Sequence, residues 1–96
     1  MIELPKEEIA TFCRKHRIAK LSVFGSALSD DFGPGSDVDF LVEFEAGHVP
    51  GLIRLAAMER ELSEIIGRKA DLRTAGDLSR YFRDEVVAAA VVQYAR

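Results

Sequence analysis

Two aspartates at positions 37 and 39 have the spacing best suited to chemistry in this sequence. Asp37 and Asp39 open the apolar segment 38–44, which has the composition of a strand. Side chains two residues apart in a strand point to the same face, so the two carboxylates are expected side by side. Their repulsion would be relieved by a cation between them. Magnesium takes one or two carboxylates and completes its shell with water and substrate phosphates, so the pair predicts a magnesium site for a phosphate ester.

A third carboxylate belongs to the same hypothesis. Asp71 stands near the start of the short segment 70–73, which reads as another strand after an intervening helix. A chain segment of this length that forms a strand, a helix and a second strand can place the second strand beside the first, so Asp71 is expected near Asp39. Three carboxylates could hold metal ions that stabilise the attacking and leaving oxygens of an in-line displacement. Asp71 could also accept a proton from an attacking hydroxyl.

The pair Gly25-Ser26 follows the apolar segment 21–24 and is the candidate phosphate cradle. Glycine lets a phosphate approach the backbone closely, and turn amides with the Ser26 hydroxyl can donate hydrogen bonds to its oxygens. Each element alone has a structural explanation, because glycine and serine are ordinary turn residues and aspartates are common at strand ends. The combination, with ten residues between Ser26 and Asp37 and with Asp71 beyond a helix, favours a nucleotide site.

The elements that must position these residues are predicted from hydrophobic periodicity and turn residues. The order is helix, strand, strand, helix, strand, helix. The predicted ranges are a helix at 5–17, strands at 21–24 and 38–44, a helix at 52–66 ending at Gly67, a strand at 70–73, and a helix at 78–95 after a capping-box pattern from Thr74 to Asp77; the segment 29–36 is predicted to be a turn.

The length of 96 residues allows one domain, spanning 1–96. We expect a small α+β domain in which helices pack on one face of a mixed sheet of three to four strands. The other face is then free to carry polar chemistry.

Composition narrows the function classes. The net charge of −3 and the isoelectric point of about 5.3 make direct binding of nucleic acid an unfavoured function. Cys13 is the single cysteine, so no disulfide framework or paired-cysteine zinc motif is predicted, and its helical position predicts a core residue. His16 and His48 lack partners at metal-ligand spacing and are expected to be structural or solvated. No signal peptide or membrane span is evident, so we expect a cytoplasmic protein that does not bind membranes.

The motifs resemble a known family. The segment Leu21–Ser26, the segment Ser36–Val42, Asp71-Leu72 and the ending Tyr81–Tyr94 are similar to the minimal nucleotidyltransferase (MNT) family of the DNA polymerase beta-like nucleotidyltransferase superfamily. The resemblance implies a fold like the polymerase beta palm, with Gly25 and Ser26 binding the phosphates of ATP. It also implies that Asp37 and Asp39 bind Mg²⁺ and that Asp71 completes the site.

The resemblance also implies a partner. Members of the MNT family are often encoded beside a HEPN-domain protein, and in several pairs the MNT antitoxin transfers AMP from ATP to a tyrosine of the HEPN toxin. The expected function is therefore that of a Mg-dependent protein adenylyltransferase, the antitoxin of a type VII toxin–antitoxin system. The alternative is a catalytically weak or inactive module that neutralises a HEPN toxin by binding. A polymerase subunit is disfavoured by the acidic isoelectric point.

Two features bear on these alternatives. The turn after Ser26 reads Ala27-Leu28-Ser29-Asp30-Asp31 and lacks the arginines that many family members carry there. This departure favours the binding alternative or a partner that supplies the basic group. The apolar segment Val86–Val92 exceeds what one buried stripe requires, so part of it is expected at an interface with the partner or with a second copy in a homo-oligomer.

Overall fold

The computed structural model describes residues 3–29, 33 and 35–96, so part of the expected turn at 29–36 lies outside the described residues. Four strands form one sheet in the order β3-β2-β1-β4. Strand β1 is antiparallel to β2 and β4, whereas β2 and β3 are parallel. The elements are α1 (Lys6–Lys15), β1 (Ile18–Phe24), the short 3-10 helix η1 (Gly25–Leu28), β2 (Val38–Phe44), α2 (Leu52–Ile66), β3 (Ala70–Arg73), the 3-10 turn η2 (Ala75–Asp77), α3 (Arg83–Ala89) and β4 (Val91–Ala95).

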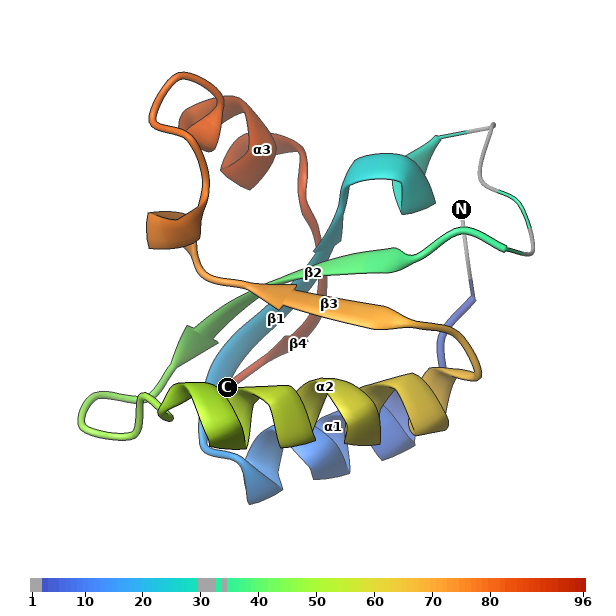
Figure 1. Ribbon diagram of the computed structural model, residues 1–96, viewed down its shortest axis with the longest axis vertical. Helices are drawn as coiled ribbons and strands as arrows, with labels where there is room; N and C mark the ends of the chain where they lie inside the picture. Colours follow the sequence, from blue (N-terminus) through green and yellow to red (C-terminus); the bar gives the residue numbers. More distant parts are fainter. Residues whose placement is uncertain (1–2, 30–32, 34) are drawn as a thin grey trace.

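The two longest helices form a layer on one face of the sheet. Figure 1 shows α1 and α2 side by side below the strands, with α3 on the opposite side. The apolar stripes of both helices are buried against inward-facing side chains of β1, β2 and β3, which confirms the α+β class with one helical layer. The buried core contains Ile9, Phe12, Cys13, Ile18, Leu21, Val23, Val38, Phe40, Val42, Met58, Leu62, Ala70 and Leu72.

Helix α2 also fixes the outer edge of the sheet. The backbone N–H of Ala70 donates to Oγ of Ser63 at 2.8 Å, and that of Leu72 donates to Oε2 of Glu59 at 2.7 Å. These side chains accept hydrogen bonds from backbone N–H groups of the edge strand β3. Without them, the N–H groups would be free to pair with another strand. The helix ends at Gly67, whose φ of 72° is the left-handed conformation that closes a helix C-terminus. Helix α2 and strand β3 thus begin and end where the sequence predicts.

The C-terminal region differs from the prediction of one helix over 78–95. Helix α3 covers only Arg83–Ala89, and β4 follows at Val91–Ala95 as an edge strand beside β1. The run of valines and alanines has no period that separates helix from strand, and the β-branched residues Val91 and Val92 favour the strand that β1 can pair. Strand β1 also begins at Ile18, three residues before the predicted start. None of the helices built from the described residues has the length and apolar character of a membrane-crossing segment.

Cys13 lies inside the helical layer, as its position in the sequence predicts. Its side chain is fully buried in α1. Burial raises the pKa of the thiol to about 12, and the nearby charge of Arg14 only partly opposes this effect. The thiol therefore remains protonated in the folded protein.

Truncation of the α2 core contact should destabilise the whole domain. Leu62 is completely buried, so we expect Leu62→Ala to lower the free energy of unfolding by about 2–5 kcal/mol. Leu52 lies in the same helix with 86% of its surface exposed, so Leu52→Ala should change it by less than about 0.5 kcal/mol. Urea unfolding followed by circular dichroism gives both values. Equal losses in the two variants would contradict the observed packing of α2.

Candidate functional site

Strands β2 and β3 bring two of the predicted carboxylates together. Asp39 and Asp71 are direct partners in the parallel register, so their side chains share the sheet face away from α1 and α2. Both side chains are half-buried, whereas Asp37, immediately before β2, is exposed. On the opposite face, the neighbours Val38 and Phe40 are fully buried, which confirms the predicted alternation along β2.

Asp39 is the carboxylate with a shifted pKa on the sheet face away from α1 and α2. Its pKa is raised, first by burial and then by the negative charges of Asp71 and Asp37, while Arg73 acts in the opposite direction. The negative charges of Asp71 and Asp37 thus both act on the carboxyl of Asp39, and we refer to Asp37, Asp39 and Asp71 as the acidic cluster. A raised pKa marks a carboxylate whose ionised form gains from a nearby cation.

The Gly25-Ser26 turn lies directly against Asp39. Phe24, the last residue of β1, pairs with Asp39, and Gly25 follows with a φ of 74°. A Cβ atom at Gly25 would lie 2.8 Å from Oδ2 of Asp39, closer than a Cβ atom approaches a non-bonded oxygen. The left-handed backbone conformation favours glycine at this position, and a larger residue would in addition have to displace the carboxylate of Asp39. Gly25 and Ser26 are exposed, so the start of η1 is open to solvent beside the acidic cluster.

Arg73 is a further candidate site residue that the sequence analysis missed. Its Nη2 lies 3.1 Å from Oδ2 of Asp71, and this hydrogen bond and charge raise the pKa of the guanidinium above its ordinary value. The signal was present in the sequence, because Arg73 follows Asp71 by two residues and a strand places both on one face. About half of the Arg73 side chain is exposed, so it remains accessible to an anion.

The described residues contain no ready-made metal group. Among residues 3–29, 33 and 35–96, no three acidic, histidine or cysteine side chains converge with the geometry of a metal site. Two carboxylates nevertheless suffice for magnesium when phosphate oxygens and water complete the shell. The donor set around Asp39 therefore fits a magnesium ion that arrives with a nucleotide.

The segment before Asp37 is held by side chains. The guanidinium of Arg68 donates to the carbonyl of Gly33 at 2.8 Å, and the backbone N–H of Gly33 lies 3.2 Å from Oγ of Ser36. These bonds tie the approach to β2 to the loop after α2. The acidic residues Asp30 and Asp31, in the turn after Ser26 that lacks arginines, lie outside the described residues.

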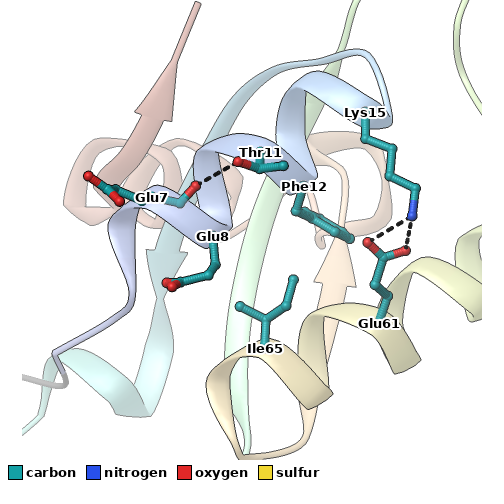
Figure 2. Close-up of a pocket in the computed structure, with 7 residues that line it drawn as sticks. All are labelled: Glu7, Glu8, Thr11, Phe12, Lys15, Glu61 and Ile65. Atoms are coloured by element: carbon teal, nitrogen blue, oxygen red, sulfur yellow. Dashed lines mark hydrogen bonds and ion pairs between the residues drawn. The ribbon is translucent and has the colours of Figure 1, made fainter.

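A hollow between α1 and α2 lies on the face opposite the carboxylates. It measures about 460 Å³. Figure 2 shows Phe12 and Ile65 at its floor and an ion pair between Lys15 and Glu61, with Nζ 3.1 Å from Oε1. The charged groups at this end of the hollow are paired with each other. Glu7 and Glu8 also line the hollow, but these carboxylates belong to the first turn of α1 and not to the sheet face that carries Asp39 and Asp71.

The two histidines have structural contacts, as predicted. His16 places its Nε2 3.1 Å from Oε1 of Glu61 and packs its ring against Phe12 with centroids 4.7 Å apart. His48, in the loop before α2, lies 3.4 Å from a guanidinium nitrogen of Arg17. Both interactions occur away from the acidic cluster, so neither histidine is a candidate site residue.

Comparison with known proteins identifies relatives over most of the chain. The family model described as a nucleotidyltransferase domain matches residues 6–92. A protein of Methanocaldococcus jannaschii, provisionally named protein adenylyltransferase MJ0435, is 31% identical over 86 residues, which cover 90% of each chain. The protein adenylyltransferase MntA of Thermococcus cleftensis is 31% identical over 80 residues, covering 75% of this chain and 79% of its own.

Solved structures share the fold. A structure described as a provisional minimal nucleotidyltransferase has a TM-score of 0.72 and 28% sequence identity, covering 90% of this chain and 86% of that chain. A crystal structure of a toxin–antitoxin with AMP-PNP has a TM-score of 0.77 and 18% identity, covering 97% of this chain and 75% of that chain. The resemblance found in the motifs is thereby confirmed over the whole domain.

The repulsion around Asp39 should make Asp39→Asn more stable than the wild type in metal-free buffer. Because the pKa of Asp39 is raised on folding, the native state binds this proton more tightly than the unfolded chain does. The ionised carboxylate therefore costs stability above the folded pKa, and this cost disappears as the pH falls toward the ordinary value of 3.8. The Tm advantage of the variant should be largest near pH 7 and should shrink on acidification.

The matched control is Glu43→Gln, which removes an exposed carboxylate from the same strand and face. Thermal unfolding in EDTA between pH 3 and 8 measures all three proteins. A Tm advantage of Asp39→Asn that does not depend on pH would contradict an electrostatic origin.

Gly25→Ala should be more costly than the same change at another glycine of similar conformation. Gly47 has a φ of 79° and no atom close to an added Cβ. Gly47→Ala should therefore lower the free energy of unfolding by only about 1–2 kcal/mol, the cost of a left-handed backbone for a residue with a side chain. Gly25→Ala should cost more, because it also displaces the carboxylate of Asp39. In an Asp39→Ala background this excess should vanish, as measured by a double-mutant cycle in urea. An unchanged cost in that background would show that the two residues are not in contact.

Proposed function

The chain belongs to the nucleotidyltransferase domain family, and on that premise we propose that it transfers AMP from ATP to a hydroxyl of a HEPN-domain toxin. The observation that carries the proposal is the contact between the Gly25 turn and Asp39, which is itself paired with Asp71. A phosphate-binding turn and an acidic cluster meet there on one exposed face. The relatives named protein adenylyltransferase support AMP as the transferred group.

We propose that Gly25 and Ser26 bind the phosphates and that Asp37, Asp39 and Asp71 bind magnesium. Mg²⁺ delivered with ATP would neutralise phosphate charge and draw the carboxylates toward the nucleotide. The exposed amides of the turn donate to phosphate oxygens without a side chain in the way. Half-burial of Asp39 and Asp71 strengthens their attraction to a cation, because charges interact more strongly away from bulk water.

The residues then assist an in-line displacement. The acceptor hydroxyl oxygen forms a bond to the α-phosphorus of ATP while the bond to the bridging β-phosphate oxygen breaks, and pyrophosphate leaves. Asp71 accepts the hydroxyl proton through the oxygen that Arg73 does not engage. Arg73 supplies positive charge on the site face, which compensates for the absence of arginine in the turn after Ser26.

The partner is assigned to the exposed apolar surface of the C-terminal region. Tyr81, Phe82, Val87 and Val92 are large apolar side chains that are between 45% and 77% exposed. Exposed apolar side chains of this kind are typical of a protein-binding surface. The structural neighbours described as toxin–antitoxin share this fold and support a toxin as the occupant of this surface. We place the reaction in the cytoplasm, where ATP and such a toxin are available.

Catalysis and partner binding should be separable by mutation. Asp39→Asn should reduce AMP transfer by more than about a hundredfold, because it removes a charge that acts on the transferring phosphate, while capture of the HEPN partner persists. Val87→Ser should weaken capture, whereas Val49→Ser, which changes a 73% exposed valine in a distant loop, should not. Pull-down and intact mass of the partner, with ATP and Mg²⁺ or EDTA, measure both properties.

The two functional alternatives predict different results for the wild type. A mass gain of the partner that requires ATP and Mg²⁺ supports the adenylyltransferase. A partner that is captured and inhibited by wild-type protein but never gains the mass of AMP would overturn it in favour of neutralisation by binding alone.

A further inference from the structure

Three arginines gather where α1 ends and β1 begins. They line a hollow of about 330 Å³, whose lining consists of Arg14, Arg17, Glu45, Tyr94 and Arg96. Tyr94 pairs with the buried Leu21 and packs against the core, so the hollow lies on the face of the sheet that α1 covers. Figure 1 shows the C-terminus at the end of the sheet where β1 begins, whereas η1 follows the other end of β1. The hollow is therefore separated from the acidic cluster by the length of β1 and by the sheet itself.

Positive charge exceeds negative charge in this hollow. Glu45 is the one carboxylate side chain among the described residues of the lining. Its Oε1 lies 3.2 Å from Nε of Arg17 and 3.3 Å from Nη1 of Arg96, so two arginines converge on a single oxygen. Arg14 adds a third guanidinium to the lining. Even with the terminal carboxylate of Arg96 included, the positive groups outnumber the negative ones, in a chain whose net charge is −3.

The backbone holds Arg17 in a conformation that residues with a side chain rarely adopt. Its φ of 58° is left-handed, which glycine would adopt at lower cost. The N–H of Arg17 donates to the carbonyl of Arg14 at 3.3 Å, and the N–H of Glu45 donates to the carbonyl of Arg17 at 2.9 Å. The second bond fixes residue 17 beside the carboxylate. Backbone strain of this kind is common at ligand sites, where the surrounding structure maintains it.

The chemistry of the lining suits a phosphate group. Guanidinium groups donate pairs of hydrogen bonds to the oxygens of phosphates and carboxylates. Oε1 of Glu45 already occupies the position where two guanidinium groups meet, so it marks where an oxygen of a ligand would bind. A phosphate monoester has more charge and more acceptor oxygens than one carboxylate, so it can engage all three arginines. Tyr94 adds a hydroxyl and a ring, and the volume is at the lower end of the range for small-molecule sites.

We propose that this hollow is an oxyanion site that binds a phosphate group, free or esterified to a small molecule. Arg14, Arg17 and Arg96 surround the phosphate, and Glu45 is the internal group that it displaces. The site does not depend on the proposed adenylyltransferase activity, because it shares no residue with the acidic cluster or with the turn after β1. A bound phosphate joins α1, β1 and β4 through their arginines and so stabilises the folded chain.

Nuclear magnetic resonance locates the bound anion. Inorganic phosphate is titrated into isotope-labelled wild-type protein in EDTA, with sodium chloride of equal ionic strength as the reference. The Nε–Hε signals of Arg14 and Arg17 should shift and saturate with a dissociation constant on the order of 1 mM, whereas the amide signals of Gly25 and Ser26 should not shift. Shifts confined to the Gly25-Ser26 turn, or equal shifts at the exposed Arg60 of α2, would overturn the site.

Variants separate these arginines from the general charge of the protein. Arg17→Gly suits the left-handed backbone, so the fold should persist while the phosphate affinity falls about tenfold. Arg14→Gln should also weaken binding, whereas the matched control Arg60→Gln, at an exposed position outside the hollow, should not. Glu45→Gln should raise the affinity about tenfold, because no internal carboxylate then competes for the arginines. Circular dichroism verifies that each variant folds. Unchanged affinity in Arg17→Gly or in Glu45→Gln would overturn the proposal.

Two further anions identify the class of ligand. Tighter binding of phenyl phosphate than of inorganic phosphate assigns the site to a phosphate ester whose organic part contacts Tyr94. Equal or tighter binding of inorganic phosphate assigns it to the free ion. Acetate should bind about tenfold or more weakly than either, because it has fewer charges and fewer oxygens. Acetate that binds as tightly as phosphate would overturn the choice of phosphate, and the hollow would then receive a carboxylate of an acidic protein segment.

Discussion

The repulsion between Asp39 and Asp71 is the constraint around which this domain is organised. Two carboxylates in direct register on neighbouring strands would separate if the strands were free to slide or part. The opposite face prevents this, because Phe40 and Leu72, the next pair along the same two strands, are buried beneath the helices. Helix α2 adds hydrogen bonds to the outer edge of β3. Apolar burial on one face thus holds together charges that repel on the other.

The limited space around Asp39 also explains why glycine stands at position 25 and why Arg73 lies further along β3. A side chain at position 25 would displace the carboxylate of Asp39, so glycine lets this carboxylate lie directly against the turn. Arg73 offsets part of the negative charge without filling the centre of the face, because it pairs with Asp71 from a position further along β3. The face therefore combines negative charge around Asp39 with an exposed turn and an accessible guanidinium, which are the features that our proposal of a metal-bound polyphosphate requires.

The sequence predicts those parts of the fold in which the hydrophobic periodicity agrees with the turn and capping residues. Strand β2, helix α2 and strand β3 have the predicted bounds, because alternation, an amphipathic stripe and Gly67 each carry a distinct local signal. The juxtaposition of Asp39 with Asp71 also follows from a strand–helix–strand return. The boundary between α3 and β4 could not be predicted, because pairing of β4 with β1 is a tertiary contact and the preceding valines and alanines suit either element. The alternation that places Arg73 beside Asp71, in contrast, was visible in the sequence.

The burial of Cys13 gives the domain a built-in reporter of its own opening. Alkylating reagents react with thiolates, and this lone thiol is both enclosed and held in its protonated form. Labelling must therefore wait for α1 to lift from the sheet, so its rate measures how often the helical layer detaches. Because α1 packs on the strand that leads into Gly25, any ligand that binds only the closed form slows the labelling. The native chain can thus be titrated by mass spectrometry without a tag, a dye or an added residue.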